Sequence, residues 1–440
     1  MRKPLINVDH CKNRRDKLKS ASKESEAFIF FSGRAPKRSN DTNYKFRVDS
    51  NFFYLTGFEE EGAILVFRPG KTPETTVFVH PKDPVMETWE GFMFGKELAK
   101  SEFGFDETYV EPDFDSKVVE LLEEVDSVYF KVGENAKQDE RVLTAMKKVL
   151  RKKGRKGHPF QDIKDPDQHM AGLRVVKTEE EIELMRKASE VSAKAHIEVM
   201  KAIKPGVNEA YLEGVFSSEI LKMGAKGVAY NTISAVGNNA TTLHYVFNDE
   251  ECKDGDLYLI DAGAEYQYYA GDITRTYPVG ADFTKAQRDV YEKVLEVQKN
   301  IVSLVKPGVS FKELGERADK ALTEAMIELG LLTGSVEENM ANKSQKKYYP
   351  HGLGHFLGMD VHDIGYYEKN NEAVPFEAGM CLTIEPGLYI PEGDMNAPEH
   401  LRGIGVRIED DILVTKDAHE NMTALVPKEI DEMLALKSKG

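Results

Sequence analysis

A short turn signal occurs twice in the carboxyl-terminal half of the chain. Lys204-Pro-Gly-Val-Asn208 and Lys306-Pro-Gly-Val-Ser310 lie 102 residues apart, and each stands between two amphipathic helical segments. Pro and Gly end the first helix, and Asn208 or Ser310 is placed to cap the next one. Strand-rich sequence with carboxylates follows each helix pair, at 257–276 and at 380–414. A chance recurrence is the simpler alternative, but the matched order favours a duplicated fold with its site between the copies.

The first third of the chain predicts a separate, smaller domain. Apolar runs at 27–31, 63–67, 76–80 and 127–132 are typical of strands, and residues 116–124 and 138–150 are typical of helices. Periodicity is lost between 152 and 172, and a long helix then begins at Thr178, with Glu181 in capping-box spacing. Because 440 residues exceed one ordinary core, we expect an α/β (α+β) fold in two parts. These are an amino-terminal α/β domain, residues 1–172, and a duplicated domain, residues 173–440.

Composition limits the partners and the compartment. Lys and Arg number 59 against 75 Asp and Glu, a net charge of −16 that disfavours nucleic acid and anionic membrane surfaces. No apolar run is long enough to span a bilayer, and no secretory signal is visible. Three widely spaced cysteines, Cys11, Cys252 and Cys381, suit neither a disulfide framework nor a zinc knuckle. We therefore expect a cytoplasmic protein.

Carboxylates stand in the predicted strands of both repeats. Asp261 ends the run Leu257–Asp261, and Asp272 lies on a second predicted strand, 268–276, that a short turn joins to the first. Asp is depleted in strands, and a buried carboxylate needs a cation or several hydrogen-bond donors. For one such pair, aspartates of a surface turn are the commoner explanation.

The second repeat also has carboxylates in predicted strands. Glu385 ends the strand that begins at Met380, and Glu409 lies within the predicted strand 405–414. Strand alternation places Arg407 on the same face as Glu409, so Arg407 is a candidate supporting partner. A satisfied Arg–Glu pair explains one strand alone, but four carboxylates from both repeats favour a site.

Several histidines lie near the same stretches of chain. His351-Gly-Leu-Gly-His355 and Val361-His362-Asp363 precede the strand of Glu385, and His244 follows the first helix pair. The glycines favour a loop over a helix. Any single histidine is more often structural than a ligand. Four carboxylates with an imidazole, however, would repel one another unless cations were bound. Two divalent ions would balance the charge; the oxygen-rich set favours Mn²⁺, with Co²⁺, Fe²⁺ and Zn²⁺ left open, and predicts metal-assisted hydrolysis.

The ordered motifs resemble a known family. LIDAG, GDITRT, HGLGH, TIEPG and RIEDD are similar to the metal-binding motifs of the pita-bread metallopeptidases, which include methionine aminopeptidase, prolidase and aminopeptidase P. The amino-terminal third resembles the corresponding domain of bacterial aminopeptidase P, which methionine aminopeptidases lack, at Arg47, Ser50–Phe52, Tyr54–Phe58, Trp89, Gly91 and Gly95. Creatinase has that domain but lacks the ligands.

The resemblance implies a role for each matching residue. The metal ligands would be Asp261, Asp272, His355, Glu385 and Glu409, with Asp272 and Glu409 bridging two divalent ions, most simply Mn²⁺. Glu385 would also act as general base and acid, His362 would stabilise the oxyanion, and His244 would position the substrate, while His351 and Arg407 would support the site. Substrate contacts are expected from Asp41, Trp89, Tyr230 and Tyr389.

The resemblance also implies an activity and an assembly. The expected reaction is metal-dependent removal of an amino-terminal residue from peptides with proline at the second position. A prolidase restricted to Xaa-Pro dipeptides, and an inert peptide-binding protein of the same fold, are the alternatives. A homodimer or homotetramer is expected, in which Asp41 would reach a neighbouring active site.

Overall fold

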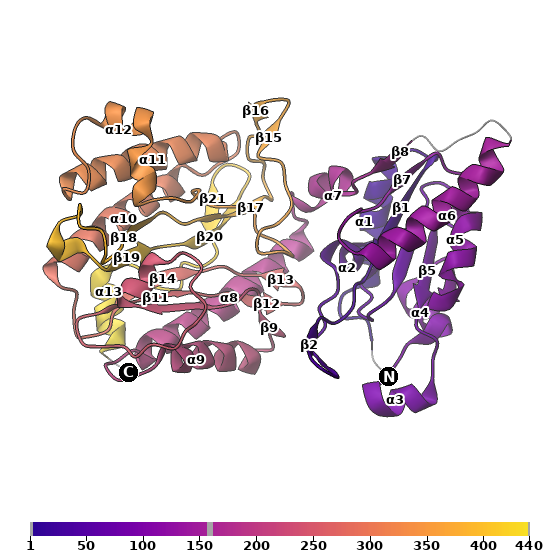
Figure 1. Cartoon of the computed structure of the whole chain (residues 1–440), viewed down its shortest axis with the longest axis horizontal. Coiled ribbons are helices and arrows are strands. Elements are labelled where there is room, and N and C mark those ends of the chain that lie inside the picture. The colour runs from indigo at the N-terminus through magenta and orange to yellow at the C-terminus, as the bar shows by residue number, and fades with distance from the viewer. Residues whose placement is uncertain (1–2, 156–161, 439–440) are drawn as a thin grey trace. The chain divides into compact units, whose positions relative to one another are not determined.

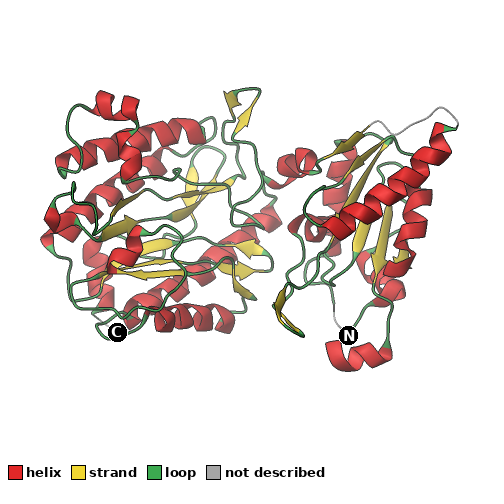
Figure 2. Ribbon diagram, in the orientation of Figure 1, coloured by secondary structure: helices red, strands yellow, loops and turns green. Residues whose placement is uncertain are grey.

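The computed structural model describes residues 3–155 and 162–438. The chain divides into two compact units, Met1–Leu173 and Arg174–Gly440, so the division lies one residue from the expected boundary. Each unit contains helices and strands of its own (Figure 1, Figure 2). Within the described ranges, no helix has both the length and the apolar character needed to cross a bilayer.

The amino-terminal unit is built on a six-stranded mixed sheet in the order β6-β5-β4-β1-β7-β8. Strands β1, β7 and β8 run parallel, β5 and β6 run parallel, and β4 is antiparallel to both β1 and β5. The sheet strands are β1 Glu26–Phe31, β4 Ile64–Phe67, β5 Thr75–Val79, β6 Glu107–Val110, β7 Ser127–Tyr129 and β8 Asp162–Lys164. The helices are α1 Val8–Ser20, α2 Ser50–Thr56, α3 Pro84–Glu90, α4 Gly95–Phe103, α5 Phe114–Leu122, α6 Ala136–Gly154 and α7 Asp167–Arg174. A separate hairpin contains β2 Lys37–Ser39 and β3 Thr42–Asn43.

The segment after residue 152 holds more regular structure than its sequence indicates. Helix α6 continues to Gly154, and β8 and α7 lie in the stretch expected to be irregular; residues 156–161 of that stretch lie outside the described part. Among the described strands, β8 pairs only with β7, and its side chains are exposed or half-buried. An edge strand that buries neither face shows no hydrophobic alternation, so the pattern could not reveal it.

The carboxyl-terminal unit repeats one arrangement twice. Helices α8 Glu179–Ala202 and α9 Glu209–Lys222 precede the sheet β10-β11-β14, and α10 Lys285–Leu304 and α11 Phe311–Glu328 precede the sheet β17-β20-β21. The strands are β9 Gly227–Val228, β10 Ile233–Val236, β11 Leu257–Asp261, β12 Ala264–Tyr266, β13 Tyr269–Ala270, β14 Thr274–Pro278, β15 Glu368–Lys369, β16 Glu372–Ala373, β17 Cys381–Ile384, β18 Gly387–Ile390, β19 Ile404–Arg407, β20 Asp410–Val414 and β21 His419–Asn421. Helices α12 Val336–Asn342 and α13 Ile430–Lys437 complete it. Figure 1 shows the strands of both halves side by side between the helices.

The two Pro-Gly turns make the same backbone contacts, which confirms the predicted repeat. The Gly206 N–H donates to Cys252 O at 2.8 Å, and the Gly308 N–H donates to Phe376 O at 2.9 Å. In return, the amides of Cys252 and Phe376 donate to the carbonyls of Val207 and Val309 at 2.8 and 2.6 Å. Asn208 and Ser310 cap α9 and α11 through their side chains, as their positions predict.

The predicted start of the helix at Thr178 is confirmed, whereas the single strand predicted at 405–414 is wrong. Helix α8 begins after Thr178 with the predicted capping box, in which Thr178 and Glu181 satisfy each other's backbone amides. The stretch 405–414, expected as one strand, is instead two strands, β19 and β20, in different sheets. The break falls at Ile408 and Glu409, because the Glu409 amide donates to Thr274 O in the other repeat at 3.1 Å.

Candidate metal centre

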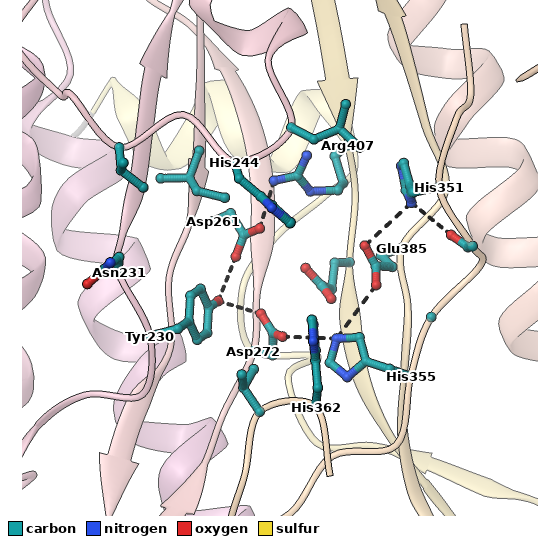
Figure 3. A pocket seen from close by; sticks show the side chains of 17 residues that line it. Tyr230, Asn231, His244, Asp261, Asp272, His351, His355, His362, Glu385 and Arg407 are labelled. Atoms are coloured by element: carbon teal, nitrogen blue, oxygen red, sulfur yellow. Dashed lines mark hydrogen bonds and ion pairs between the residues drawn. The ribbon is translucent and has the colours of Figure 1, made fainter. Parts of the chain in front are cut away.

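A cavity of about 540 Å³ lies in the carboxyl-terminal unit, and its polar wall carries the carboxylates of both repeats (Figure 3). Asp261 is the last residue of β11, and Asp272 stands two residues before β14. Glu385 directly follows β17, and Glu409 directly precedes β20. Since β11 pairs with β14 and β17 with β20, each repeat contributes two carboxylates from one end of a paired set of strands.

The closest group of potential ligands joins the two repeats. Asp272, His355 and Glu409 each offer a ligand atom, and these atoms all lie within 4.8 Å of one another. His355 Nε2 lies 3.4 Å from Asp272 Oδ2 and 3.6 Å from Glu385 Oε1. Asp261 is tied to the group through Tyr230, whose hydroxyl lies 2.6 Å from Asp261 Oδ1 and also contacts Asp272.

Burial and mutual repulsion disfavour the charged forms of the carboxylates Asp272, Glu385 and Glu409. Burial raises the pKa of Glu385 to about 7, against the opposing attraction of His355. Burial, followed by repulsion from Asp272, raises the pKa of Glu409 well above its usual value. Burial alone would lower the pKa of His355, but its contact with Asp272 raises it to about 9. A set of four carboxylates and an imidazole is chemically suited to divalent cations, whose charge would remove this repulsion.

Arg407 forms hydrogen bonds with Asp261 and with Thr274. Its Nη2 donates to Asp261 Oδ2 at 2.7 Å, and its Nε lies 3.1 Å from the Thr274 hydroxyl. That hydroxyl donates to Glu409 Oε2 at 2.6 Å. Arg407 therefore contacts Asp261 directly and reaches Glu409 only through Thr274, so the supporting role expected of it involves both carboxylates.

Buried hydrogen bonds also hold the backbone of Asp272. The Asp272 amide lies 3.2 Å from both carboxylate oxygens of Asp411, and the Ser189 hydroxyl donates to Asp411 Oδ2 at 2.8 Å. Asp411 follows Glu409 by two residues, so one short segment supplies a candidate ligand, Glu409, and the group that holds the backbone of another, Asp272.

The three remaining histidines occupy different parts of the cavity wall. His362 packs its ring against that of His355, with 4.2 Å between the centroids. Burial, then the charge of His355, lowers the pKa of His362. His351 bonds the Tyr389 hydroxyl at 2.8 Å, and burial lowers its pKa to about 3. His244 lies on the cavity wall in the loop before Tyr245.

The sequence-predicted residues separate into three groups. The cavity brings together those of the carboxyl-terminal unit, namely Tyr230, His244, Asp261, Asp272, His351, His355, His362, Glu385, Arg407 and Glu409. Tyr389 lies behind this wall, buried, with its hydroxyl bonded to His351 and, at 3.0 Å, to Arg407 Nη1. Asp41 and Trp89 belong to the other compact unit, where both are exposed.

Sequence reasoning missed two kinds of residue. An apolar part of the wall is formed by Ile233, Leu243, Val246 and Val361, which come from separate segments and share no pattern. The supporting residues Thr274 and Asp411 were also missed. Thr274 could have been found, because strand alternation places it on the same face as Asp272 two residues earlier.

Known proteins match this chain over nearly its whole length. Residues 183–416 match the model of metallopeptidase family M24, and residues 11–129 match that of the aminopeptidase P N-terminal domain. The Xaa-Pro aminopeptidase of Escherichia coli strain K12 is 39% identical over 437 residues, covering 98% of both chains.

Solved structures agree with the sequence matches. Proline aminopeptidase P II from Yersinia pestis has a TM-score of 0.94 and 39% identity, and the match covers 99% of this chain and 100% of that one. Zinc-substituted E. coli aminopeptidase P in complex with product has a TM-score of 0.94 and 38% identity, with 99% of both chains covered. These matches agree with the order of the motifs and with the duplicated fold. The chain belongs to metallopeptidase family M24, among the aminopeptidase P proteins.

Proposed function

We propose that this protein is a metal-dependent aminopeptidase that hydrolyses the bond between an amino-terminal residue and a following proline. One observation carries the proposal. Asp272, His355 and Glu409 converge within 4.8 Å on the wall of a cavity, in a chain that matches Xaa-Pro aminopeptidases over nearly its full length. Its substrates would be peptides with proline at the second position.

The ligand set that we propose is Asp261, Asp272, His355, Glu385 and Glu409, which would hold two divalent ions. The oxygen-rich donors support Mn²⁺ as the resident metal. Such ions supply Lewis-acid chemistry: they lower the pKa of a water molecule and polarise the carbonyl of the scissile bond.

The chain's own residues would handle the protons and orient the substrate. Glu385 would accept a proton from the attacking water and return it to the leaving nitrogen of proline. His362 would donate a hydrogen bond to the carbonyl oxygen as negative charge develops on it. His244 would position the peptide. His351 bonds the Tyr389 hydroxyl through Nε2 and Gly352 O through Nδ1, so its supporting role would be to line the site beside Glu385, whose Oε2 lies 3.8 Å from Nδ1.

The apolar lining of the cavity supports the proposal that a proline ring binds next to the scissile bond. Ile233, Leu243, Val246 and Val361 form an apolar part of the wall, on the cavity that also contains the carboxylates. The pyrrolidine ring of proline is apolar and has a fixed φ, so a rigid apolar wall can bind it with little further ordering.

We also propose an oligomeric assembly and a cytoplasmic location for this protein. Trp89 is 81% exposed on α3, a helix with no buried residue, and Asp41 is exposed in the turn between β2 and β3. This exposure supports a homodimer or homotetramer in which these residues contact a neighbouring subunit, with Asp41 near its substrate. All three cysteines are free and buried, which fits a cytoplasmic protein. Sedimentation measurements on the wild type and on Trp89→Ala test the assembly.

The experiment that tests the function compares Xaa-Pro-Yaa and Xaa-Pro side by side, using protein stripped of metal by a chelator. We expect cleavage of the tripeptide at its first bond, and only after Mn²⁺ is restored. Cleavage of the dipeptide alone would make the protein a prolidase. Cleavage of neither substrate, with Mn²⁺ bound, would contradict the enzymatic proposal.

A pair of matched variants tests the ligand set. Asp272→Asn is expected to lose Mn²⁺ binding and activity while remaining folded. Asp282→Asn, which alters an aspartate paired with Arg288 on the surface of the same unit, should retain both. Full activity in Asp272→Asn would rule out its assignment as a metal ligand.

A further inference from the structure

His362 lies on the wall of the cavity. Within the described residues, its imidazole contacts the ring of His355 but pairs with no donor or acceptor. A histidine that must meet a carbonyl oxygen needs a defined position, because misplacement of about 1 Å can lower a rate by roughly 100-fold. The position of His362 must therefore be set largely by its backbone.

The next residue, Asp363, is locked in a buried ion cluster. Its side chain is 1% exposed and lies between Arg174 and Lys177, whose side chains are 2% and 1% exposed. Lys177 Nζ lies 2.9 Å from Asp363 Oδ2, and Arg174 Nη2 contacts the other oxygen, Oδ1. Arg174 Nη2 also donates to Asp360 Oδ2 at 2.7 Å, so two cations face two carboxylates.

The loop that bears His362 is folded tightly around this carboxylate. The Asp363 amide donates to Phe356 O at 2.8 Å, and the Ala270 amide donates to Gly358 O at 2.8 Å. A Cβ on Gly358 would lie 2.1 Å from Asp363 Oδ2, so only glycine allows this approach. The loop therefore has little freedom while Asp363 remains in place.

The backbone at Lys177 is itself tied to the segment that leads into β17 and the site. The Lys177 amide donates to Gly379 O at 2.9 Å, and Val176 forms a β-bridge with Met380 immediately before β17. Strand β17 leads directly to Glu385. Asp363 thus connects the loop of His362 to the framework that places Glu385.

We propose that Asp363, held by Arg174 and Lys177, is a positioning residue that fixes the backbone of His362 and so aims its imidazole at the reacting carbonyl. The proposal rests on the proposed function. Buried ion pairs add little net stability compared with apolar packing, but they do define one geometry when every partner is satisfied. Asp363 does not contact the substrate, and its effect passes through His362.

The test begins with Asp363→Asn, which keeps the shape and removes the charge. We expect kcat to fall by about 10- to 100-fold, while KM and the affinity for Mn²⁺ change less than twofold. Hydrogen exchange should accelerate in peptides from the loop 356–364 and remain unchanged in β14. A matched control is Asp394→Asn, which breaks the contact of another carboxylate with Lys347 at 2.6 Å and should leave kcat unchanged.

A double-mutant cycle separates positioning from general destabilisation. In a His362→Ala background, Asp363→Asn should lower kcat no further, because the group through which it acts is gone. An equal loss of kcat in both backgrounds would overturn the proposal, as would a parallel loss of Mn²⁺ affinity. If Asp363→Asn does not fold, Lys177→Met removes one cation and should show the same pattern to a smaller degree. Failure of the wild type to cleave Xaa-Pro-Yaa would refute the function instead, and the exchange measurement would still test the loop.

Discussion

His196 offers a measurable link between pH and the stability of the metal-binding unit. It lies on α8 with no exposed surface, and its Nε2 is 2.9 Å from Ala262 O, one residue after Asp261. Since a carbonyl only accepts, Nε2 carries the proton of the neutral ring. Within the described residues, Nδ1 has no hydrogen-bond partner. Protonation would place a charged N–H in the core without an acceptor, and burial lowers the pKa of His196 to about 4.

The size of the effect follows from the two pKa values. An unfolded histidine titrates near 6.5, so a folded value of about 4 means that the native state binds fewer protons in the interval between them. The stabilisation is fully present above the unfolded pKa and is lost as the pH falls through 6.5 towards 4. At pH 4.5 the unfolding free energy should be lower by about 2.5 kcal/mol than at pH 7.5, from this residue alone.

Hydrogen exchange on metal-free protein can isolate this contribution. Protection in peptides from residues 191–202 gives the opening free energy of α8 at each pH, and His196→Gln removes the titrating ring while keeping an amide donor. We expect the wild type to lose about 2.5 kcal/mol more than His196→Gln between pH 7.5 and 4.5. The reasoning is refuted if the two proteins lose protection in parallel.

Three further substitutions test other parts of the structure. Arg407→Lys breaks the contacts to Asp261 and Tyr389 and should weaken Mn²⁺ binding by about 10- to 100-fold, measured by calorimetric titration against Arg402→Lys as the control. Thr178→Ala removes the capping box of α8 and should lower the unfolding free energy by about 1 kcal/mol, measured in urea. Leu382→Ala, in the fully buried strand β17, should lower the melting temperature through a loss of about 2–5 kcal/mol, measured by calorimetry.

Much of the fold could be predicted because its signals are local. The caps at Thr178, Asn208 and Ser310 each depend on a few neighbouring residues, and all three form in the structure. The division of 405–414 into two strands depends instead on a contact between the Glu409 amide and Thr274 O, 135 residues away in the chain. No periodicity in either segment encodes such a contact, so the pattern predicts one continuous strand.

The candidate site shows the same limit. The ordered motifs pick out the residues that the cavity collects, because their sequence contexts are distinctive. Alternation correctly turns Arg407 towards the site, but it cannot choose between Asp261 and Glu409 as the partner, since that choice depends on how two sheets face each other. The burial of Tyr389 could not be predicted either, because it follows from the pairing of β18 with β19.

The charge of the chain is distributed in a way that suits this site. Residues 1–173 carry equal numbers of acidic and basic side chains, so the whole net charge of −16 belongs to the unit that contains the carboxylate cluster. Long-range attraction extends about 8 Å in physiological salt, so this field concentrates cations near the unit rather than fixing them. Binding must come from the cluster itself, where burial already disfavours the charged forms of Glu385 and Glu409. Because divalent ions bind the charged carboxylates, metal loading should release protons and stabilise this unit far more than the neutral amino-terminal one.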